Sequence, residues 1–232
     1  MDESTLKSAP NPAAHVPDWD AVTTVCLDMD GTVLDLRFDN LFWLDALPRR
    51  WGEKHGVPAD QAIPQLHARF DAKRGTLEWY CVDHWSEELD FDIAALKAEM
   101  HEHIRYLPGA LGFLDAVRAR GKRLLLTTNA HPISLDVKNR ATGLARHFDE
   151  LVSSHEFGIP KEEPEFWDRL AQSHGVDPAA TLFVDDSVAV LRAARAAGVR
   201  QIYQVLWPDS TQPLRAALPG FTAIRGLGDL AP

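Results

Sequence analysis

Cysteine is scarce in this sequence, and so is positive charge. Only Cys26 and Cys81 occur among 232 residues, which does not support a fold held together by disulfide bonds. Acidic residues outnumber basic ones, and the net charge is −10 at pH 7. Because affinity for nucleic acids comes mainly from basic side chains on phosphates, this charge argues against a nucleic-acid polymer as a partner. Small anions can still bind at local positive groups.

The sequence also lacks a long apolar run. No stretch approaches the length needed to cross a bilayer, and residues 1–17 have neither the basic start nor the apolar segment of a signal peptide. We therefore expect a cytoplasmic protein without a membrane partner. Residues 1–17 are rich in alanine, proline and small polar residues, which predicts a disordered tail. The rest is long enough for one sizeable core and a smaller module.

The stretch that organises the chain is residues 22–35, VTTVCLDMDGTVLD. Its apolar start predicts a strand buried on both faces of a parallel sheet, and such strands present functional groups at their C-terminal ends. Asp28 and Asp30 follow and, in an extended chain, would point to the same side. Two carboxylates ~4 Å apart repel by roughly 4 kcal/mol at an effective dielectric of ~20, so the pair calls for a cation or a shared proton. Oxygen ligands favour a hard ion such as Mg²⁺, although Asp followed by Gly31 also occurs in ordinary turns.

Strand and helix patterns alternate along most of the chain. Five apolar strands are expected after the first, at residues 123–130, 151–154, 181–187, 201–206 and 221–224. Residues 37–107 interrupt the alternation with four amphipathic helical patterns and no strand. The predicted fold class is therefore α/β: a Rossmann-like parallel sheet flanked by helices, with an inserted small α-helical cap. We expect residues 18–36 and 108–232 to form the core and residues 37–107 the cap.

The apolar strand followed by DxDGT resembles the first motif of the haloacid dehalogenase-like hydrolases. This resemblance implies an enzyme in which Asp28 is the nucleophile that forms an aspartyl-phosphate, while Asp30 is the general acid and base. It also implies that the hydroxyl group of Thr128 and the backbone amide of Asn129 hold phosphate oxygens. The substrate would be a small-molecule phosphomonoester.

The same resemblance implies a neutralising lysine and a Mg²⁺ site. Lys161 matches the lysine of the third motif, although Glu162 follows it where the family usually has proline. Asp186 aligns with the metal ligand of the fourth motif and Asp185 supports it, with the choice between these two left open. The implied metal ligands are Asp28, Asp30 and Asp186.

Three predicted strands end in polar residues, in agreement with this resemblance. The pairs are Asp28 with Asp30, Thr128 with Asn129, and Asp185 with Asp186. The C-terminal ends of neighbouring parallel strands share one edge of a sheet, so these side chains should meet. A phosphomonoester needs a nucleophile, a proton donor, a cation and donors for its oxygens, and this edge offers a candidate for each. For Thr128 alone, strand propensity would be an equally simple explanation.

Longer strings resemble one branch of the superfamily, the GMP/IMP 5′-nucleotidases, over residues 18–206. The strings are DMDGTVLDLRFDNLFW at 28–43, TLEWYCVDHWSEEL at 76–89, TNAHP at 128–132, FGIPKE at 157–162 and TLFVDDS at 181–187. The branch implies a purine nucleoside 5′-monophosphate as substrate. Trp79 and Tyr80 lie off the apolar stripe of the cap and are candidates to stack on the base, whereas Trp85 lies on the stripe and should be core. Asp39 and Asn40 are candidates to contact base or ribose.

Other functions remain open. A broad sugar-phosphate or phosphoglycolate phosphatase, or a phosphomutase, would share the first chemical step. A receiver-like phosphoacceptor module is disfavoured, because it needs neither DxDGT nor a helical insertion. A metal-free dehalogenase would not need Asp30, since a halide leaves without a proton. Phosphonate hydrolysis would require a cap lysine in an apolar setting, and the sequence suggests none for Lys73 or Lys97.

The ten histidines do not predict a transition-metal site. His101 and His103 are two residues apart in a helical pattern and so diverge, whereas a helical metal pair needs a spacing of three or four. The others are scattered, which favours surface or core positions. His131, just after Asn129, could line the edge of the substrate pocket.

Overall fold

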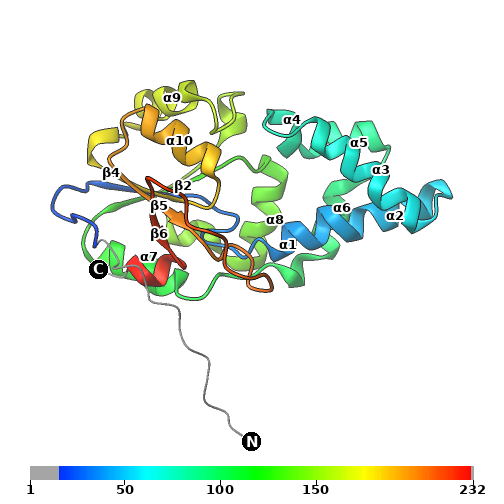
Figure 1. Ribbon diagram of the computed structural model, residues 1–232, viewed down its shortest axis with the longest axis horizontal. Helices are drawn as coiled ribbons and strands as arrows, with labels where there is room; N and C mark the ends of the chain where they lie inside the picture. The colour runs from blue at the N-terminus through cyan, green and yellow to red at the C-terminus, as the bar shows by residue number, and fades with distance from the viewer. Residues whose placement is uncertain (1–15, 231–232) are drawn as a thin grey trace, which may run out of the picture.

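A parallel sheet of six strands forms the centre of the molecule (Figure 1). The computed structural model describes residues 16–230, so almost all of the expected disordered tail lies outside the described residues. The strands are β1 Thr24–Leu27, β2 Arg123–Thr128, β3 Glu150–Ser153, β4 Thr181–Asp185, β5 Gln201–Val205 and β6 Thr222–Ile224. They lie in the order β3-β2-β1-β4-β5-β6, and every neighbouring pair is parallel. The predicted α/β class is confirmed.

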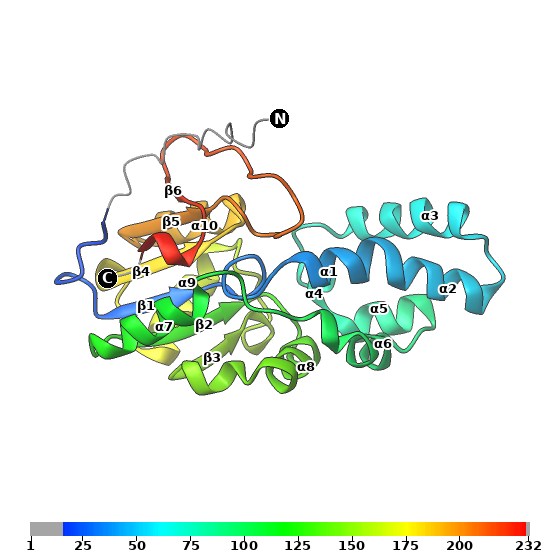
Figure 2. The same ribbon diagram turned by 90° about the horizontal axis from the view of Figure 1, so that it is seen from below.

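Helices cover both faces of the sheet (Figure 2). The longer ones are α7 Ala110–Ala119, α8 Pro132–Thr142, α9 Pro164–His174 and α10 Val188–Ala196. Short helical turns are η2 His101–His103, η3 Leu144–His147, η4 Ser154–Glu156, η5 Pro178–Ala180 and η6 Leu227–Leu230. Val25 and Leu27 of β1 pack in the cluster that contains the buried face of α7, whereas Cys26 packs in the cluster of α9 and α10. This alternation explains why β1 is apolar throughout.

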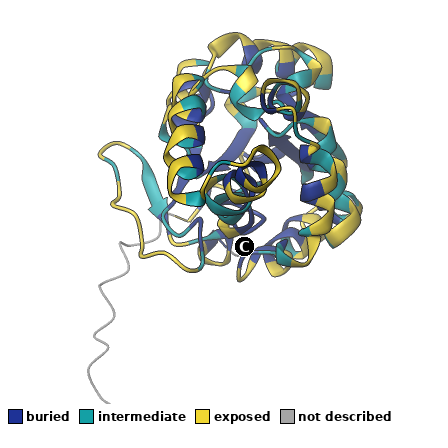
Figure 3. Cartoon of the chain, turned by 90° about the vertical axis from the view of Figure 1, so that its right-hand side faces the viewer, coloured by how far each residue is buried: buried dark blue, intermediate teal, exposed yellow. Residues whose placement is uncertain are grey.

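Between β1 and β2 the chain forms a helical lobe with an apolar core of its own (Figures 1 and 2). Its segments are α1 Arg37–Leu41, the π-helical η1 Phe42–Ala46, α2 Leu47–His55, α3 Ala59–Ala72, α4 Leu77–Tyr80, α5 Val82–Leu89 and α6 Ile93–Glu99. Trp85 is 2% exposed in this core, as expected. Seen end-on, buried residues lie mainly towards the inside of the molecule and exposed residues at its outside (Figure 3). Within residues 16–230, no helix is long and apolar enough to span a membrane.

Candidate active site

The C-terminal ends of β1, β2 and β4 lie side by side. Leu27 of β1 pairs with Leu126 of β2 on one side and with Val184 of β4 on the other. This register places Asp28 next to Asp185, and the backbone N–H of Asp28 donates to Val184 O at 3.0 Å. The expected meeting of polar strand ends therefore follows from the pairing of apolar residues one position earlier.

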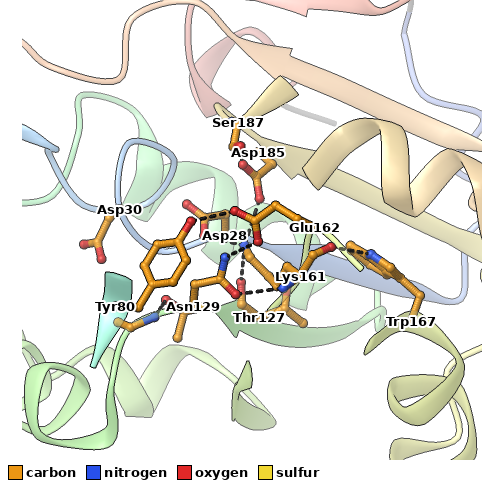
Figure 4. A network of polar contacts seen from close by, with 12 residues as sticks. Asp28, Asp30, Tyr80, Thr127, Asn129, Lys161, Glu162, Trp167, Asp185 and Ser187 are labelled. Carbon is orange, nitrogen blue, oxygen red and sulfur yellow. Dashed lines mark hydrogen bonds and ion pairs between the residues drawn. The ribbon is translucent and has the colours of Figure 1, made fainter. Parts of the chain in front are cut away.

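Lys161 is buried in the middle of this edge (Figure 4). Its Nζ donates to Asp28 Oδ1 at 2.6 Å, to Asp185 Oδ2 at 2.8 Å and to Thr127 O at 2.9 Å, so all three N–H groups have an acceptor. Burial disfavours the charged amine, but the two carboxylates outweigh it and raise the pKa of Lys161 above its ordinary value. A lysine that stays charged thus neutralises part of the charge on Asp28 and Asp185.

Side-chain hydrogen bonds fix the loop that carries Lys161 and connect it to the cap (Figure 4). Asn129 Oδ1 accepts from Lys161 N at 2.9 Å, and Trp167 Nε1 donates to Lys161 O at 2.9 Å. Asn129 Nδ2 also donates to Glu162 Oε2 at 2.8 Å, and the hydroxyl of Tyr80 in α4 donates to Glu162 Oε1 at 2.6 Å. Glu162, which stands where proline is usual, therefore links the core to the cap. Burial and the charge of Glu162 raise the pKa of Tyr80, so this phenol remains a donor.

Thr128 closes β2 and is almost fully buried. Its Oγ1 accepts a hydrogen bond from Ala130 N at 3.0 Å, which shapes the turn from β2 into α8. A hydroxyl group that accepts in this way still carries one donor proton. The hydroxyl group of Thr128 can therefore still donate one hydrogen bond.

Three carboxylates gather beside Lys161: oxygens of Asp28, Asp185 and Asp186 all lie within 4.8 Å of one another. Burial raises the pKa of Asp28 to about 7, of Asp185 to about 6 and of Asp186 to about 7; repulsion within the group adds to this, while Lys161 opposes it. The other positive partner is the half-exposed Arg215, with Nη1 2.7 Å from Asp186 Oδ2. Negative charge is thus in excess, and an oxygen-only group of this kind fits a hard divalent cation.

The turn after β1 packs closely on this carboxylate group. Gly31 has a φ of +90°, and a Cβ there would lie 2.9 Å from Asp186 Cγ and 2.8 Å from Pro208 Cβ. Only glycine tolerates both the dihedral angle and the contact. The turn itself is closed by a hydrogen bond from Gly31 N to Leu34 O at 2.7 Å.

The side chain of Asp30 lies outside this group, and the role of Asp30 as a metal ligand stays a prediction. The chain turns directly after Asp28, so the two first-motif aspartates do not stay on one side. The carboxylate of Asp30 lies instead 2.7 Å from Lys138 Nζ in α8. Burial raises the pKa of Asp30 to about 7, with the charge of Asp39 adding and Lys138 opposing. A carboxyl group that exchanges its proton near neutral pH is suited to general acid and base catalysis.

Two lysines whose burial the sequence did not predict contact Asp39 in α1. Lys138 Nζ lies 2.6 Å from Asp39 Oδ2, and Lys97 Nζ of α6 lies 3.4 Å from Asp39 Oδ1. Burial opposes ionisation of Asp39, but the two lysines outweigh it and hold the pKa of Asp39 below its ordinary value. The buried positions of α8 are Ser134 and Lys138, which are both polar. A helix whose inward i, i+4 positions are polar could have indicated a site beneath it.

Lys97 has an apolar setting after all, so the sequence-based statement about it was wrong. Its side chain is 1% exposed, and Nζ lies 4.2 Å from the ring centroid of Phe42 and 5.0 Å from that of Trp43. Burial lowers the pKa of Lys97 to about 8, while Asp39 opposes the effect. The Lys97 ammonium group is also paired with the Asp39 carboxylate, with Nζ 3.4 Å from Oδ1.

A cavity of about 420 Å³ extends from Asp30 into the cap. Its lining includes Asp30, Ser134, Asp39, Asn40, Trp43, Trp79, Tyr80 and Lys97. Trp79 and Tyr80, the predicted pocket residues, both line it. Asn40 Nδ2 donates to Asp209 Oδ2 at 2.7 Å, which holds the start of the cap against the core. The cavity therefore has polar groups at its core end and aromatic rings in the cap.

These observations define the class of protein. The sequence profile of the haloacid dehalogenase-like hydrolases matches residues 22–198. The matched region carries strands β1 to β4 of the parallel sheet, the aspartates at the ends of β1 and β4 and the buried Lys161. The chain belongs to this hydrolase family, and the predictions of the family and of an enzyme are confirmed.

Individual relatives show which members of the family this chain resembles. The GMP/IMP nucleotidase YrfG of Escherichia coli is 45% identical over 192 residues, which are 83% of this chain and 86% of that protein. The phosphoserine phosphatase of Thermus thermophilus is 36% identical over 137 residues, 58% of this chain and 53% of that one. The crystal structure of a HAD phosphatase from Thermococcus onnurineus covers 90% of this chain and 96% of its own with a TM-score of 0.76; at 20% identity it supports the fold alone. The predicted resemblance to GMP/IMP nucleotidases is confirmed.

Proposed function

We propose that this enzyme is a Mg²⁺-dependent phosphomonoester hydrolase that prefers purine nucleoside 5′-monophosphates such as GMP and IMP, with residues 37–107 acting as its cap. The observation that carries the proposal is the cavity, which extends from Asp30 at the strand ends to aromatic rings in the cap. A phosphoryl group bound at Asp28 would leave its nucleoside in this cavity. The name of the Escherichia coli relative supports the purine preference.

Each step of the proposed hydrolysis is assigned to a residue of this site. Asp28 attacks phosphorus and forms an aspartyl-phosphate, which water then hydrolyses. Asp30 donates its proton to the leaving O5′ atom and afterwards accepts one from the attacking water. Lys161 and the hydroxyl group of Thr128 hold phosphoryl oxygens, together with the backbone N–H of Asn129. The charge of Lys161 also favours the ionised, nucleophilic form of Asp28.

The carboxylate group would hold Mg²⁺ through Asp28 and Asp186. Both oxygens of Asp185 already accept hydrogen bonds, one from Lys161 Nζ at 2.8 Å and one from Ser187 N at 2.7 Å. Asp185 therefore supports the site, and Asp186 is the better ligand from β4. When bound, Mg²⁺ supplies positive charge that stabilises the transferring phosphoryl oxygens.

Removal of divalent cations is expected to abolish hydrolysis, and added Mg²⁺ should restore it. The buried carboxylates carry more negative charge than Lys161 and Arg215 balance, so Mg²⁺ should also raise the melting temperature of the metal-free protein. Turnover of an aryl phosphate and the melting temperature should be measured against Mg²⁺ concentration for wild type, Asp186→Asn and the control Asp45→Asn, a half-exposed residue of η1 that pairs with Arg49. Undiminished turnover in chelated buffer would contradict the electrostatic argument.

Recognition of a purine would come from the walls of the cavity. Trp43 and Trp79 offer flat rings, and stacking on an aromatic side chain is worth roughly 1 to 3 kcal/mol per base. Lys97 lines the same cavity and can only donate hydrogen bonds. Guanine and hypoxanthine both carry a 6-oxo acceptor, whereas adenine carries an amino group. We therefore expect 6-oxopurine nucleotides to be preferred over AMP.

Trp79→Ala is expected to reduce kcat/KM for IMP and GMP by about tenfold, which corresponds to ~1.4 kcal/mol of lost stacking. The loss should be smaller for a hexose phosphate and for phosphoglycolate, because neither has a ring to stack. Phe91→Ala, which removes a cap ring outside the cavity, serves as the matched control.

A wild-type preference for IMP over UMP and the small phosphates of less than tenfold, or an equal loss on all substrates, would count against a purine pocket. The enzyme would then be a broad small-metabolite phosphatase. A phosphomutase would instead transfer the phosphoryl group to a second sugar hydroxyl and release little inorganic phosphate.

A further inference from the structure

A second cluster of potential metal ligands lies where the cap meets the core. Cys81 belongs to the cap, between α4 and α5, whereas His131 starts α8 and His155 lies in η4. One potential ligand atom from each lies within 4.8 Å of the other two. The imidazole rings of His131 and His155 are 4.8 Å apart and nearly perpendicular. The scattered positions of the histidines in the sequence had suggested separate surface or core residues, but His131 and His155 lie next to each other.

His155 has a nitrogen that the fold leaves available. Its Nε2 is buried and has no hydrogen-bond partner among the described residues. The ring also hydrogen-bonds to the backbone of Asn129, and since Nε2 is unpaired this bond uses Nδ1. Metal-binding histidines are commonly oriented in this way, with one nitrogen on a backbone carbonyl and the other on the metal. Burial lowers the pKa of His155 to about 4, with His131 adding to the effect, so the ring is neutral as a ligand must be.

The neighbouring groups are compatible with a bound ion. Cys81 Sγ accepts from His84 N at 3.4 Å, a bond that a metal-bound thiolate would keep. His131 Nε2 lies 3.6 Å from Asp83 Oδ2, so an exposed carboxylate on the cap is within reach as a fourth ligand. Coordination through His131 Nε2 would move the ring proton to Nδ1 and give up a long contact from Ile133 N at 3.4 Å.

We propose that Cys81, His131 and His155 bind one Zn²⁺ ion, with Asp83 or water in the fourth position, and that this ion fastens the cap to the core. One thiolate and two imidazoles form a donor set typical of tetrahedral Zn²⁺, whereas the carboxylate group at Asp28 offers only oxygen. Cys81 follows Tyr80, which lines the cavity, and His131 follows the loop that carries Asn129. Zn²⁺ should therefore hinder opening of the cavity and lower turnover while Mg²⁺ is saturating.

The test of binding uses Co²⁺ as a spectroscopic substitute for Zn²⁺, added to the full-length protein in excess Mg²⁺. We expect one equivalent of Co²⁺ to give a thiolate-to-metal charge-transfer band that Zn²⁺ displaces. Cys81→Ser should lose the band, and His155→Gln should bind Co²⁺ at least ~10-fold more weakly. His103→Gln, at a partly exposed histidine outside the cluster, serves as the matched control and should bind like wild type. Cys26 cannot produce the band, because it is fully buried in the sheet core.

Inhibition of hydrolysis by Zn²⁺ tests separately whether the ion fastens the cap to the core. Zn²⁺ should inhibit hydrolysis of an aryl phosphate by wild type, and Cys81→Ser should require at least ~10-fold more Zn²⁺ for the same inhibition. Zn²⁺ should also protect Cys81 from a thiol reagent.

Absence of a charge-transfer band in wild type, or unchanged Co²⁺ affinity in His155→Gln, overturns the site. Equal inhibition of wild type and Cys81→Ser overturns the fastening role, since Zn²⁺ would then act at the oxygen ligands. All of these results are independent of which phosphomonoester is the natural substrate.

Discussion

Turnover of phosphomonoesters is expected to fall by roughly 10⁴-fold or more when Asp28 is replaced by asparagine. An amide oxygen cannot attack phosphorus to form the acyl-phosphate, so the whole covalent route is lost. The fold should survive, because Lys161 keeps its bonds to Asp185 and Thr127. The measurement is the steady-state rate with an aryl phosphate and with IMP, together with acid-quenched capture of labelled phosphate on the protein.

The exposed Asp168→Asn on α9 is the matched control, with the same chemical change at a residue outside the strand ends. Wild type and this control should both retain labelled phosphate after the quench, and Asp28→Asn should retain none. A variant at position 28 that still turns over at a measurable fraction of the wild-type rate would show that another group, or water, attacks phosphorus.

Lys161→Met is expected to damage both stability and catalysis. Removing one partner from a buried ion pair typically costs ~3–5 kcal/mol, because the remaining charges stay buried without compensation. Burial already raises the pKa of Asp28 and Asp185 in wild type, and loss of the Lys161 charge should raise both pKa values further. The free energy of unfolding should therefore fall more steeply than in wild type as the pH rises from ~4 through ~7. Denaturant unfolding of wild type and variant at several pH values measures this.

Lys73→Met controls for the loss of a lysine, since Lys73 is only partly buried and makes no ion pair within 4.0 Å among the described residues. It should leave the pH dependence unchanged. If Lys161→Met is as stable as wild type at high pH, the carboxylates are neutralised by other groups and Lys161 has only a catalytic role.

Local patterns predicted the sheet and the strand ends well. An apolar strand of four residues followed by two aspartates is a short-range signal, and the parallel register then brings Asp28, Thr128 and Asp185 to one edge without further information. The side-chain direction of Asp30 was not predictable in this way, because it depends on the turn that Gly31 makes against Asp186. The pattern of apolar residues along a strand does not indicate at which residue the extended conformation ends.

The contacts between cap and core could not be predicted from sequence patterns, for a different reason. Lys97, Lys138 and Glu162 acquire their roles from partners that are far away in the chain, such as Asp39 for both lysines. Nothing in the immediate neighbourhood of each residue indicates its burial. The Mg²⁺ requirement and the cytoplasmic location stay predictions.

The position of Lys138 between Asp30 on the core and Asp39 on the cap has a thermodynamic consequence. The charge of Asp39 raises the pKa of Asp30, and Lys138 is shared between the two carboxylates. A movement that carried Asp39 away with the cap would remove the repulsion and leave Lys138 to Asp30 alone, so Asp30 would release its proton more readily. Proton uptake by Asp30 and closure of the cap are thus linked equilibria in which each favours the other. Asp30, the proposed general acid, should therefore hold its proton more tightly when the cap is closed and release it more readily when the cap opens.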